Sequence, residues 1–323
     1  MDPGVGISYK TSEQIRRRIR ATDYLTVAEL FLSQNFLLDH PLSFADIKSR
    51  LLGHWGTCHG INVVYANLKH FYSTRPEFQF VLGPGHGFPA LQANLFLDGD
   101  LEKVDHKASR TLAGIEYLCK SFSFPGGFPS HSSPLTPGVI TEGGELGYAI
   151  GAAYGAALGH PEKTIAVLVG DGEFETGSAL ASLNFDKLIA GETNGRVLPI
   201  LALNGYKISG PTVFARKSRR EQLEMIRGFG FTPILIDGDE PEKFQFALHT
   251  AESIKAPFIL FEIEKGKTGP SEVAGQKVAG NYLAHQIPLP LAKTDSEQLA
   301  QLEDWLKSYH FEELYIEGKG FCI

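Results

Sequence analysis

The sequence has little cysteine. Its 323 residues include only Cys58, Cys119 and Cys322, which are odd in number, widely spaced and without a CxxC pair. Disulfide-stabilised secreted domains and cysteine-built zinc sites need several cysteines at close, regular spacing. The sequence therefore indicates neither a disulfide framework nor a cysteine zinc site, and it fits a reduced compartment.

Long apolar runs and an excess of positive charge are also lacking. No apolar run is long enough to cross a bilayer, and residues 1–20 contain no continuous apolar stretch of the kind that a secretory signal needs. The net charge of −7 argues against general binding to nucleic acids or anionic membranes, which requires a basic surface. We therefore expect a cytoplasmic protein that binds neither nucleic acid nor membrane.

What the sequence does contain is a set of short runs rich in Val, Ile, Leu and Phe. Their apolar character is continuous, which is typical of strands in a parallel sheet that is covered on both faces. Segments with helical spacing alternate with them. We predict an α/β fold, a doubly wound and mostly parallel sheet with helices on both faces. The expected strands are 78–85, 164–170, 196–205, 232–238 and 256–266, and the expected helices are 142–158, 178–191, 219–230 and 242–254.

The two ends of the chain read as helical. Residues 12–38 and 296–315 have helical patterns, and the first 60 residues contain no clear strand. We predict two parts: a helical N-terminal extension over residues 1–60, packed on a main α/β domain over residues 61–323.

Glycine-rich polar motifs follow four of the five expected strands. They are GPGHG (83–87), GDGE (170–173), NGYK (204–207) and EKGKTG (264–269). Ligands bind beyond the carboxyl ends of the strands in open α/β sheets. The four motifs are therefore expected to lie along one edge.

The GDG motif and the asparagine one strand later suit a metal-bound diphosphate. Asp171 and Asn204 offer the oxygen ligands that Mg²⁺ prefers, and the backbone carbonyl of Tyr206 could add a third. Glycines let the backbone approach phosphate oxygens, and a helix beginning near Thr176 would favour negative charge. A purely structural alternative stays open, because Asp between glycines and Asn-Gly are both common in turns.

Four histidines lie in segments that are rich in turn-forming residues such as glycine and proline. Imidazoles can transfer protons near neutral pH or donate hydrogen bonds to substrate oxygens. A single loop histidine is more often structural, and no HxH or HExxH spacing indicates zinc. The four are His54, His86, His131 and His285.

Seven longer stretches of the sequence narrow the choice of protein family. In their order and close spacing, from about residue 12 to about residue 316, they resemble the N-terminal domain of phosphoketolases, members of the transketolase-like superfamily. The strings are LLGHWGTCHGINVVYANL, GPGHGFPA, SFSFPGGFPSHSSPLTPG, EGGELGYA, GDGEFETG, LPILALNGYKISGPT and GNYLAHQIPL.

The resemblance implies an aldehyde-lyase that uses thiamine diphosphate and Mg²⁺. Such enzymes cleave xylulose 5-phosphate or fructose 6-phosphate with inorganic phosphate, which gives acetyl phosphate and a shorter aldose phosphate. By the same resemblance, Asp171, Asn204 and the Tyr206 carbonyl match the metal ligands. Gly172 and Asn204 match cofactor contacts, as do Gly144, Glu145 and Leu146 near the aminopyrimidine. The residues that match the thiazolium and substrate pocket are His54, His86, His131, His285 and Lys265.

The sequence departs from the family's strings at three positions. His59 replaces a proline, Thr141 a histidine and Lys267 a tryptophan. Family members also continue into pyrimidine-binding and C-terminal domains, which supply a glutamate that activates the cofactor. The resemblance therefore implies a homo- or hetero-oligomer in which a partner chain completes the site, the chain being inactive alone. The alternative is a catalytically inactive orphan or truncated domain that acts as a cofactor-binding or interaction module.

Overall fold

The computed structural model describes residues 7–75, 78–189 and 191–323. Residues 1–6 of the expected extension and residue 190 of the expected helix 178–191 lie outside this part. The chain divides into two compact units that alternate along the sequence. The sheet unit comprises Met1–Ile15, Val63–Gly85 and Ser132–Glu264, and the histidine unit comprises Arg16–Asn62, His86–His131 and Lys265–Ile323. The boundary expected at residues 60 and 61 stays a prediction.

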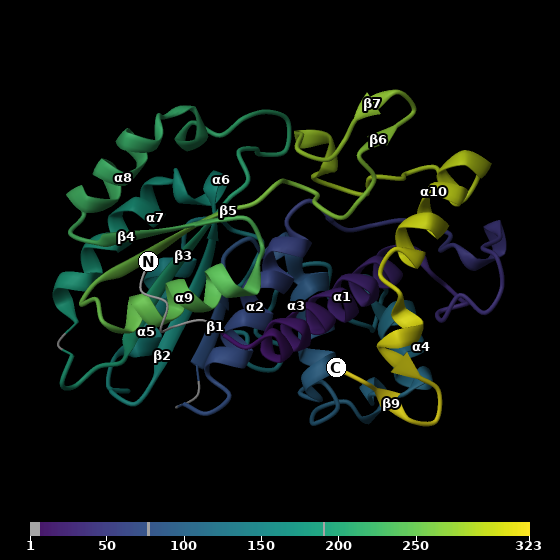
Figure 1. Cartoon of the computed structure of the whole chain (residues 1–323), viewed down its shortest axis with the longest axis horizontal. Helices are drawn as coiled ribbons and strands as arrows, with labels where there is room; N and C mark the ends of the chain where they lie inside the picture. Colours follow the sequence, from purple (N-terminus) through teal and green to yellow (C-terminus); the bar gives the residue numbers. More distant parts are fainter. Residues whose placement is uncertain (1–6, 76–77, 190) are drawn as a thin grey trace. The chain divides into compact units, whose positions relative to one another are not determined.

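The sheet unit contains a five-stranded sheet in which every neighbouring pair is parallel (Figure 1). Its strand order is β1-β2-β3-β5-β4. The predicted doubly wound α/β fold is thereby confirmed, and each expected strand is present. The strands are β1 (Phe78–Leu82), β2 (Thr164–Gly170), β3 (Arg196–Leu203), β4 (Thr232–Asp237) and β5 (Pro257–Glu262).

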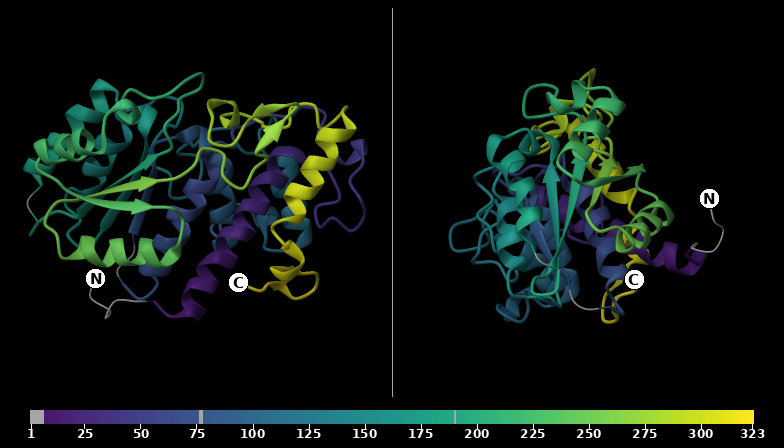
Figure 2. Two further views of the ribbon diagram at one scale, coloured as in Figure 1. Left: turned by 45° about the horizontal axis from the view of Figure 1, so that its top comes forward. Right: turned by 90° about the vertical axis from the view of Figure 1, so that its left-hand side faces the viewer.

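Helices cover both faces of this sheet (Figure 2). Side chains alternate between the faces of a strand, so Val167 and Val169 share one core with residues of α5 (Ala149–Ala157), α7 (Gly177–Ser182) and α8 (Arg219–Gly228). On the other face, Phe244 of α9 (Pro241–Glu252) meets Phe261 of β5 at 5.3 Å between ring centroids. Covering both faces explains why the strands read as continuous apolar runs.

The helix expected over residues 142–158 was wrong in its first half. Helix α5 begins only at Ala149, and residues 142–148 form a loop. Gly147 has φ +98°, which an α-helix does not permit. Gly143 donates its N–H to Ser132 O at 2.8 Å, whereas in a helix this N–H would donate to the carbonyl four residues earlier. The glycines at 143, 144 and 147 therefore belong to a loop, whereas the small residues of 149–157 form α5.

The histidine unit consists mainly of helices and of irregular segments between them. Its C-terminal helix α10 (Ser296–Lys307) is capped by Asp295, whose side chain accepts from Glu297 N and Gln298 N. This helix is shorter than the expected 296–315, because His310 adopts φ +50° soon after its end. The other helices of this unit are α3 (Phe88–Asp98), α4 (Leu112–Ser121) and parts of α1 (Tyr9–Phe31) and α2 (Cys58–Phe71); its hairpins are β6 (Glu272–Val273) with β7 (Gln276–Lys277) and β8 (Tyr315–Ile316) with β9 (Gly320–Phe321).

The described helices include none that combines the length and the apolar composition needed to cross a bilayer. The expected cytoplasmic location stays a prediction.

Candidate functional site

Three of the glycine-rich motifs meet where β1, β2 and β3 end. The N–H of Gly83, after β1, donates to Leu168 O of β2 at 2.8 Å. The N–H of Gly205, after β3, donates to Asp171 Oδ2, after β2, at 2.7 Å. The fourth motif begins at Glu264, the last residue of the sheet unit, and continues in the histidine unit. The sheet unit thus presents GPG, GDGE and NGYK along one edge.

Asp171 is the centre of this edge. Strand β2 ends at Gly170, and the short helix α6 (Asp171–Phe174) begins directly after it. The Asp171 side chain is almost fully buried, at 1% exposure. Its Oδ1 accepts from Gly172 N at 3.1 Å, and its Oδ2 accepts from Gly205 N and, at 3.2 Å, from Thr212 Oγ1. These donors fix the carboxylate in one orientation beside the loop that follows β3.

The loop over residues 204–212 closes on itself. Gly205 adopts φ +87°, a conformation that favours glycine, and its carbonyl accepts from Thr212 N at 2.9 Å. Asn204 Oδ1 accepts from Tyr206 N at 3.1 Å. The side chain of Asn204 and the backbone at Tyr206 are thereby held next to each other, on the loop that Asp171 anchors.

Glu175 forms a second anchor for the same loop. Its Oε2 accepts from Val213 N at 2.7 Å and from Phe214 N at 3.2 Å, and its Oε1 pairs with the Lys207 ammonium. Burial opposes ionisation, but Lys207 and the two backbone donors outweigh it and hold the pKa of Glu175 below its ordinary value. Glu175 and Asp171 therefore grip the loop from one short stretch of chain.

The oxygen atoms at this edge are suited to a magnesium ion that carries a diphosphate. Among the described residues, no group of three or more His, Cys, Asp and Glu side chains could hold a metal ion. A metal at this edge would therefore depend on one carboxylate together with amide and backbone oxygens. Mg²⁺ accepts such a set, since it commonly takes one or two carboxylates and completes its shell with water and phosphate. A Cβ on Gly172 would lie 3.0 Å from Lys207 Cγ, a tight contact that the Lys207 side chain would have to relieve by moving.

The loop over residues 142–148 is held at both ends. Gly147 N donates to Glu173 Oε1 at 3.2 Å, and Gly143 lies so close to Gly85 that a Cβ on Gly85 would be 2.2 Å from Gly143 Cα. Burial raises the pKa of Glu173 to about 7. Between these anchors, the three residues expected to contact the cofactor are exposed: Gly144, Glu145 and Leu146.

The four expected histidines gather within the histidine unit. The His54 ring centroid lies 5.1 Å from that of His86, 5.6 Å from that of His131 and 5.1 Å from that of His285. His86 and His285 are 4.8 Å apart. Lys265, at 2% exposure, is buried in the same unit. Residues that are up to 231 positions apart in sequence (285 minus 54) therefore form one cluster.

Three imidazoles of the histidine cluster have lowered pKa values. Burial, with the nearby charges of His131 and Lys265, lowers the pKa of His54 to about 4. Burial and Lys265 lower the pKa of His285 to about 3, and the pKa of His86 falls well below its ordinary value for the same reasons. Within the described part of the chain, Nδ1 of His54 and Nδ1 of His285 have no hydrogen-bond partner. Neutral imidazoles with open nitrogen atoms can accept or donate hydrogen bonds to a hydroxylated ligand.

His59, one of the three positions that depart from the family's sequence, has a bonding partner in the histidine unit. Its Nδ1 lies 2.7 Å from Asp23 Oδ2, and Asp23 Oδ1 accepts from Asn62 Nδ2 at 2.7 Å. All three side chains are buried. A buried imidazole that satisfies a buried carboxylate explains this position without any role in catalysis.

Sequence reasoning missed Glu173, Glu175 and Thr212. The two glutamates stand in the motif GDGEFETG, directly after Asp171, so charge and position together could have signalled them. Thr212 carries no comparable signal, because its contact with Asp171 depends on how the 204–212 loop folds.

Comparison with known proteins supports the resemblance. A family model described as the XFP N-terminal domain matches residues 7–256 and 246–321. A probable phosphoketolase of Streptomyces avermitilis is 45% identical over 318 residues, which cover 92% of this chain and 40% of that protein. A probable phosphoketolase of Mycobacterium avium is 42% identical over 334 residues, which cover 97% of this chain and 42% of that protein. The chain thus spans about two-fifths of the length of these relatives.

Solved structures show the same fold at lower sequence identity. Transketolase from Leishmania mexicana superposes with a TM-score of 0.63 at 19% identity, over 94% of this chain and 45% of that one. Transketolase from Campylobacter jejuni gives 0.62 at 19% identity, over 93% of this chain and 47% of that one. The fold is therefore transketolase-like, and the chain belongs to the phosphoketolase family, of which it represents the N-terminal domain.

Proposed function

We propose that this chain is the part of a phosphoketolase that binds Mg²⁺ and the diphosphate of thiamine diphosphate. The observation that carries the proposal is the bond from Gly205 N to Asp171 Oδ2, since it joins the ends of the adjacent strands β2 and β3. It holds the Asp171 carboxylate beside the loop that bears Asn204 and Tyr206. Thiamine diphosphate, when bound, supplies the electron sink that carbon–carbon bond cleavage requires.

The residues of the sheet unit would hold the cofactor. Asp171, Asn204 Oδ1 and the Tyr206 carbonyl would bind the metal ion, and the backbone at Gly172 would approach the diphosphate. The exposed residues 144–146 would contact the aminopyrimidine. Glu175 and Thr212 would keep the 204–212 loop in place while the metal binds.

The residues of the histidine unit would handle substrate. The imidazoles of His54, His86, His131 and His285 can donate hydrogen bonds to sugar hydroxyls and accept protons from them, while Lys265 supplies a positive charge. The substrates would be a ketose phosphate, either xylulose 5-phosphate or fructose 6-phosphate, and inorganic phosphate. The products would be acetyl phosphate and a shorter aldose phosphate, which is an aldehyde-lyase reaction.

Full activity would also use groups in the part of the relatives that this chain does not cover. The chain corresponds to about two-fifths of its relatives, so we propose that it acts in an oligomer with polypeptide that corresponds to the remaining three-fifths. We further propose that the assembly works in the cytoplasm.

An assay of acetyl phosphate tests this function. The chain is incubated with Mg²⁺, thiamine diphosphate, fructose 6-phosphate and phosphate, alone and with a polypeptide that corresponds to the remaining three-fifths of its relatives. We expect product from the mixture, little from the chain alone, and none from a mixture with Asp171→Ala. A mixture without activity would contradict the proposed reaction, and full activity of the chain alone would contradict the need for a complementary part.

A further inference from the structure

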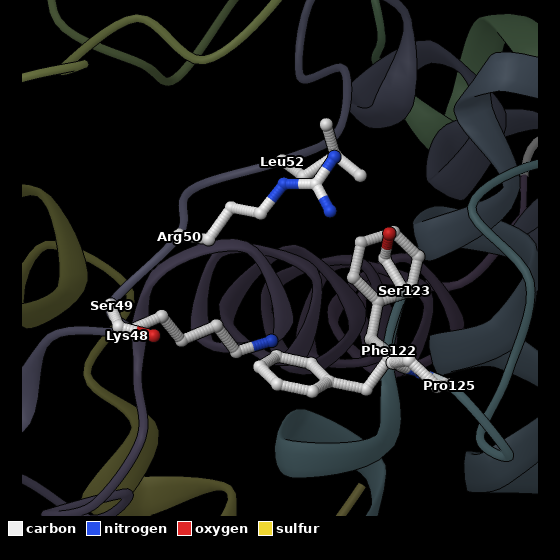
Figure 3. A pocket seen from close by; sticks show the side chains of 8 residues that line it. Lys48, Ser49, Arg50, Leu52, Phe122, Ser123 and Pro125 are labelled. Carbon is white, nitrogen blue, oxygen red and sulfur yellow. The ribbon is translucent and has the colours of Figure 1, made fainter.

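A pocket of about 200 Å³ lies in the histidine unit, outside every group considered so far. Residues 48–50 and 52 form one side of it and residues 122–125 form the other (Figure 3). None of the eight residues that line it is acidic. Two of them, Lys48 and Arg50, are cationic, and neither belongs to the metal-binding edge or to the histidine cluster.

Lys48 places a buried positive charge at this pocket. Its side chain is 5% exposed, and its Nζ donates to the carbonyl oxygen of Glu29 at 2.5 Å. An ammonium has three N–H donors, so this bond leaves others for a ligand. Nζ also lies 5.5 Å from the centroid of the Phe122 ring, which forms the adjoining wall.

The Glu29 carboxyl group is not hydrogen-bonded to Lys48. Glu29 is fully buried, and neither of its carboxyl oxygens has a hydrogen-bond partner in the described part of the chain. Burial raises the pKa of Glu29 against the opposing effect of the Lys48 charge, and burial lowers the pKa of Lys48. A buried ammonium that is not bonded to this carboxyl group favours an anion from outside.

Arg50 and Ser123 face each other across the opening. Figure 3 shows the guanidinium of Arg50 extending from the 48–52 side towards the side that carries the Ser123 hydroxyl. Ser123 adopts φ +57°, a conformation that costs a non-glycine residue free energy and that is often found at functional sites. Its N–H donates to Phe128 O at 3.0 Å, and Phe128 N donates to Ser121 O at 3.0 Å, so the turn is fixed in advance.

We propose that this pocket binds the phosphoryl group of a small phosphorylated compound. A guanidinium binds two phosphate oxygens at once, and an ammonium and a hydroxyl suit the remaining oxygen atoms of a tetrahedral anion better than those of a planar carboxylate. The rings of Phe122 and Phe124 offer apolar contact to a short carbon chain. Pockets for drug-sized ligands measure about 300 to 1,000 Å³. The smaller volume here limits the ligand to inorganic phosphate or a monoester with few carbons.

Titration calorimetry at fixed ionic strength tests the pocket with two probes, inorganic phosphate and glycerol 3-phosphate. The variant is Arg50→Gln, at an exposed position, and the matched control is Arg220→Gln, at an exposed position on α8. Hydrogen bonds to charged groups contribute about 1.5 to 3 kcal/mol, so Arg50→Gln should weaken binding by about 10- to 100-fold. Arg220→Gln should bind as the wild type does.

The comparison of the two probes identifies the source of the phosphoryl group. Tighter binding of glycerol 3-phosphate would assign the pocket to a phosphate monoester, and tighter binding of phosphate would assign it to the inorganic ion. No saturable binding of either probe below about 10 mM, or equal losses in both arginine variants, would overturn the proposal. Asp171→Ala should leave this binding unchanged, so the result is independent of the cofactor site.

Discussion

Replacement of Glu175 by alanine should weaken cofactor binding without removing any metal ligand. The change deletes the acceptor for Val213 N and Phe214 N and the partner of the Lys207 ammonium. Of the two carboxylates that anchor the 204–212 loop, Asp171 would then remain. Because the loop carries Asn204 and Tyr206, cofactor binding would have to order it first.

The size of this effect follows from the bonds that are lost. Hydrogen bonds to charged groups contribute about 1.5 to 3 kcal/mol each. The Glu175 side chain is 18% exposed, and Val213 is exposed enough for water to replace its bond, so we expect a total loss of about 2 kcal/mol. Since 1.4 kcal/mol corresponds to a factor of ten, the affinity for thiamine diphosphate at saturating Mg²⁺ should fall about 30-fold.

Calorimetry and amide hydrogen exchange together check this prediction. Glu175→Gln keeps an acceptor oxygen and should lose about threefold in affinity. The control Glu224→Ala removes an exposed glutamate that pairs with Arg220 on α8, and it should leave affinity unchanged. Amides of residues 205–214 should exchange faster in Glu175→Ala even without cofactor. Wild-type affinity together with wild-type amide exchange in Glu175→Ala would refute the role of Glu175 as an anchor of the loop.

Three further predictions concern the cofactor loop, the 142–148 loop and the histidine cluster. Thr212→Val removes the hydroxyl that donates to Asp171 Oδ2 and should lower Mg²⁺-dependent cofactor affinity about fivefold in calorimetry, whereas an unchanged affinity would show that this bond does not orient the carboxylate. Gly147→Ala places a Cβ 2.2 Å from Thr176 Oγ1 at φ +98° and should lower the free energy of unfolding by about 1 to 3 kcal/mol in urea titrations; a wild-type midpoint would contradict the strain. The pKa of His285 is about 3 in the folded chain, below its unfolded value of about 6.5, so its contribution to stability is full above pH 6.5 and is lost as the pH falls towards 3. Stability should therefore fall between pH 7 and pH 4, by up to about 1.4 kcal/mol per pH unit for each such histidine, and His285→Gln should show a shallower fall; equal slopes would argue against a neutral buried imidazole.

The strands and the edge they share could be predicted because their signals are local. A continuous run such as TIAVLVG is buried on both faces, and a motif that follows it must lie at the carboxyl end. Asp171 and the 204–206 segment follow neighbouring parallel strands, so their proximity depends only on the strand order.

The remaining features depend on contacts that a linear pattern does not encode. Residues 142–148 have helix-like spacing, but Gly143 and Gly147 bond to Ser132 and Glu173, which are distant in sequence. The histidines could be singled out by their turn-rich settings, but their ring distances, and the lowered pKa values of His54, His86 and His285, arise only when four separate segments pack. The two cations of the pocket gave no sequence signal, since neither Lys48 nor Arg50 stands in a recognisable motif.

In the proposed site, Asp171 anchors a magnesium ion and the diphosphate it carries. Calorimetric titration with thiamine diphosphate, first in Mg²⁺ and then in EDTA, compares the wild type with Asp171→Ala and with the surface control Asp304→Asn. We expect Mg²⁺-dependent binding in the wild type and in Asp304→Asn, and none that depends on Mg²⁺ in Asp171→Ala. Binding of equal affinity in Asp171→Ala, or binding in the wild type that EDTA does not change, would contradict it.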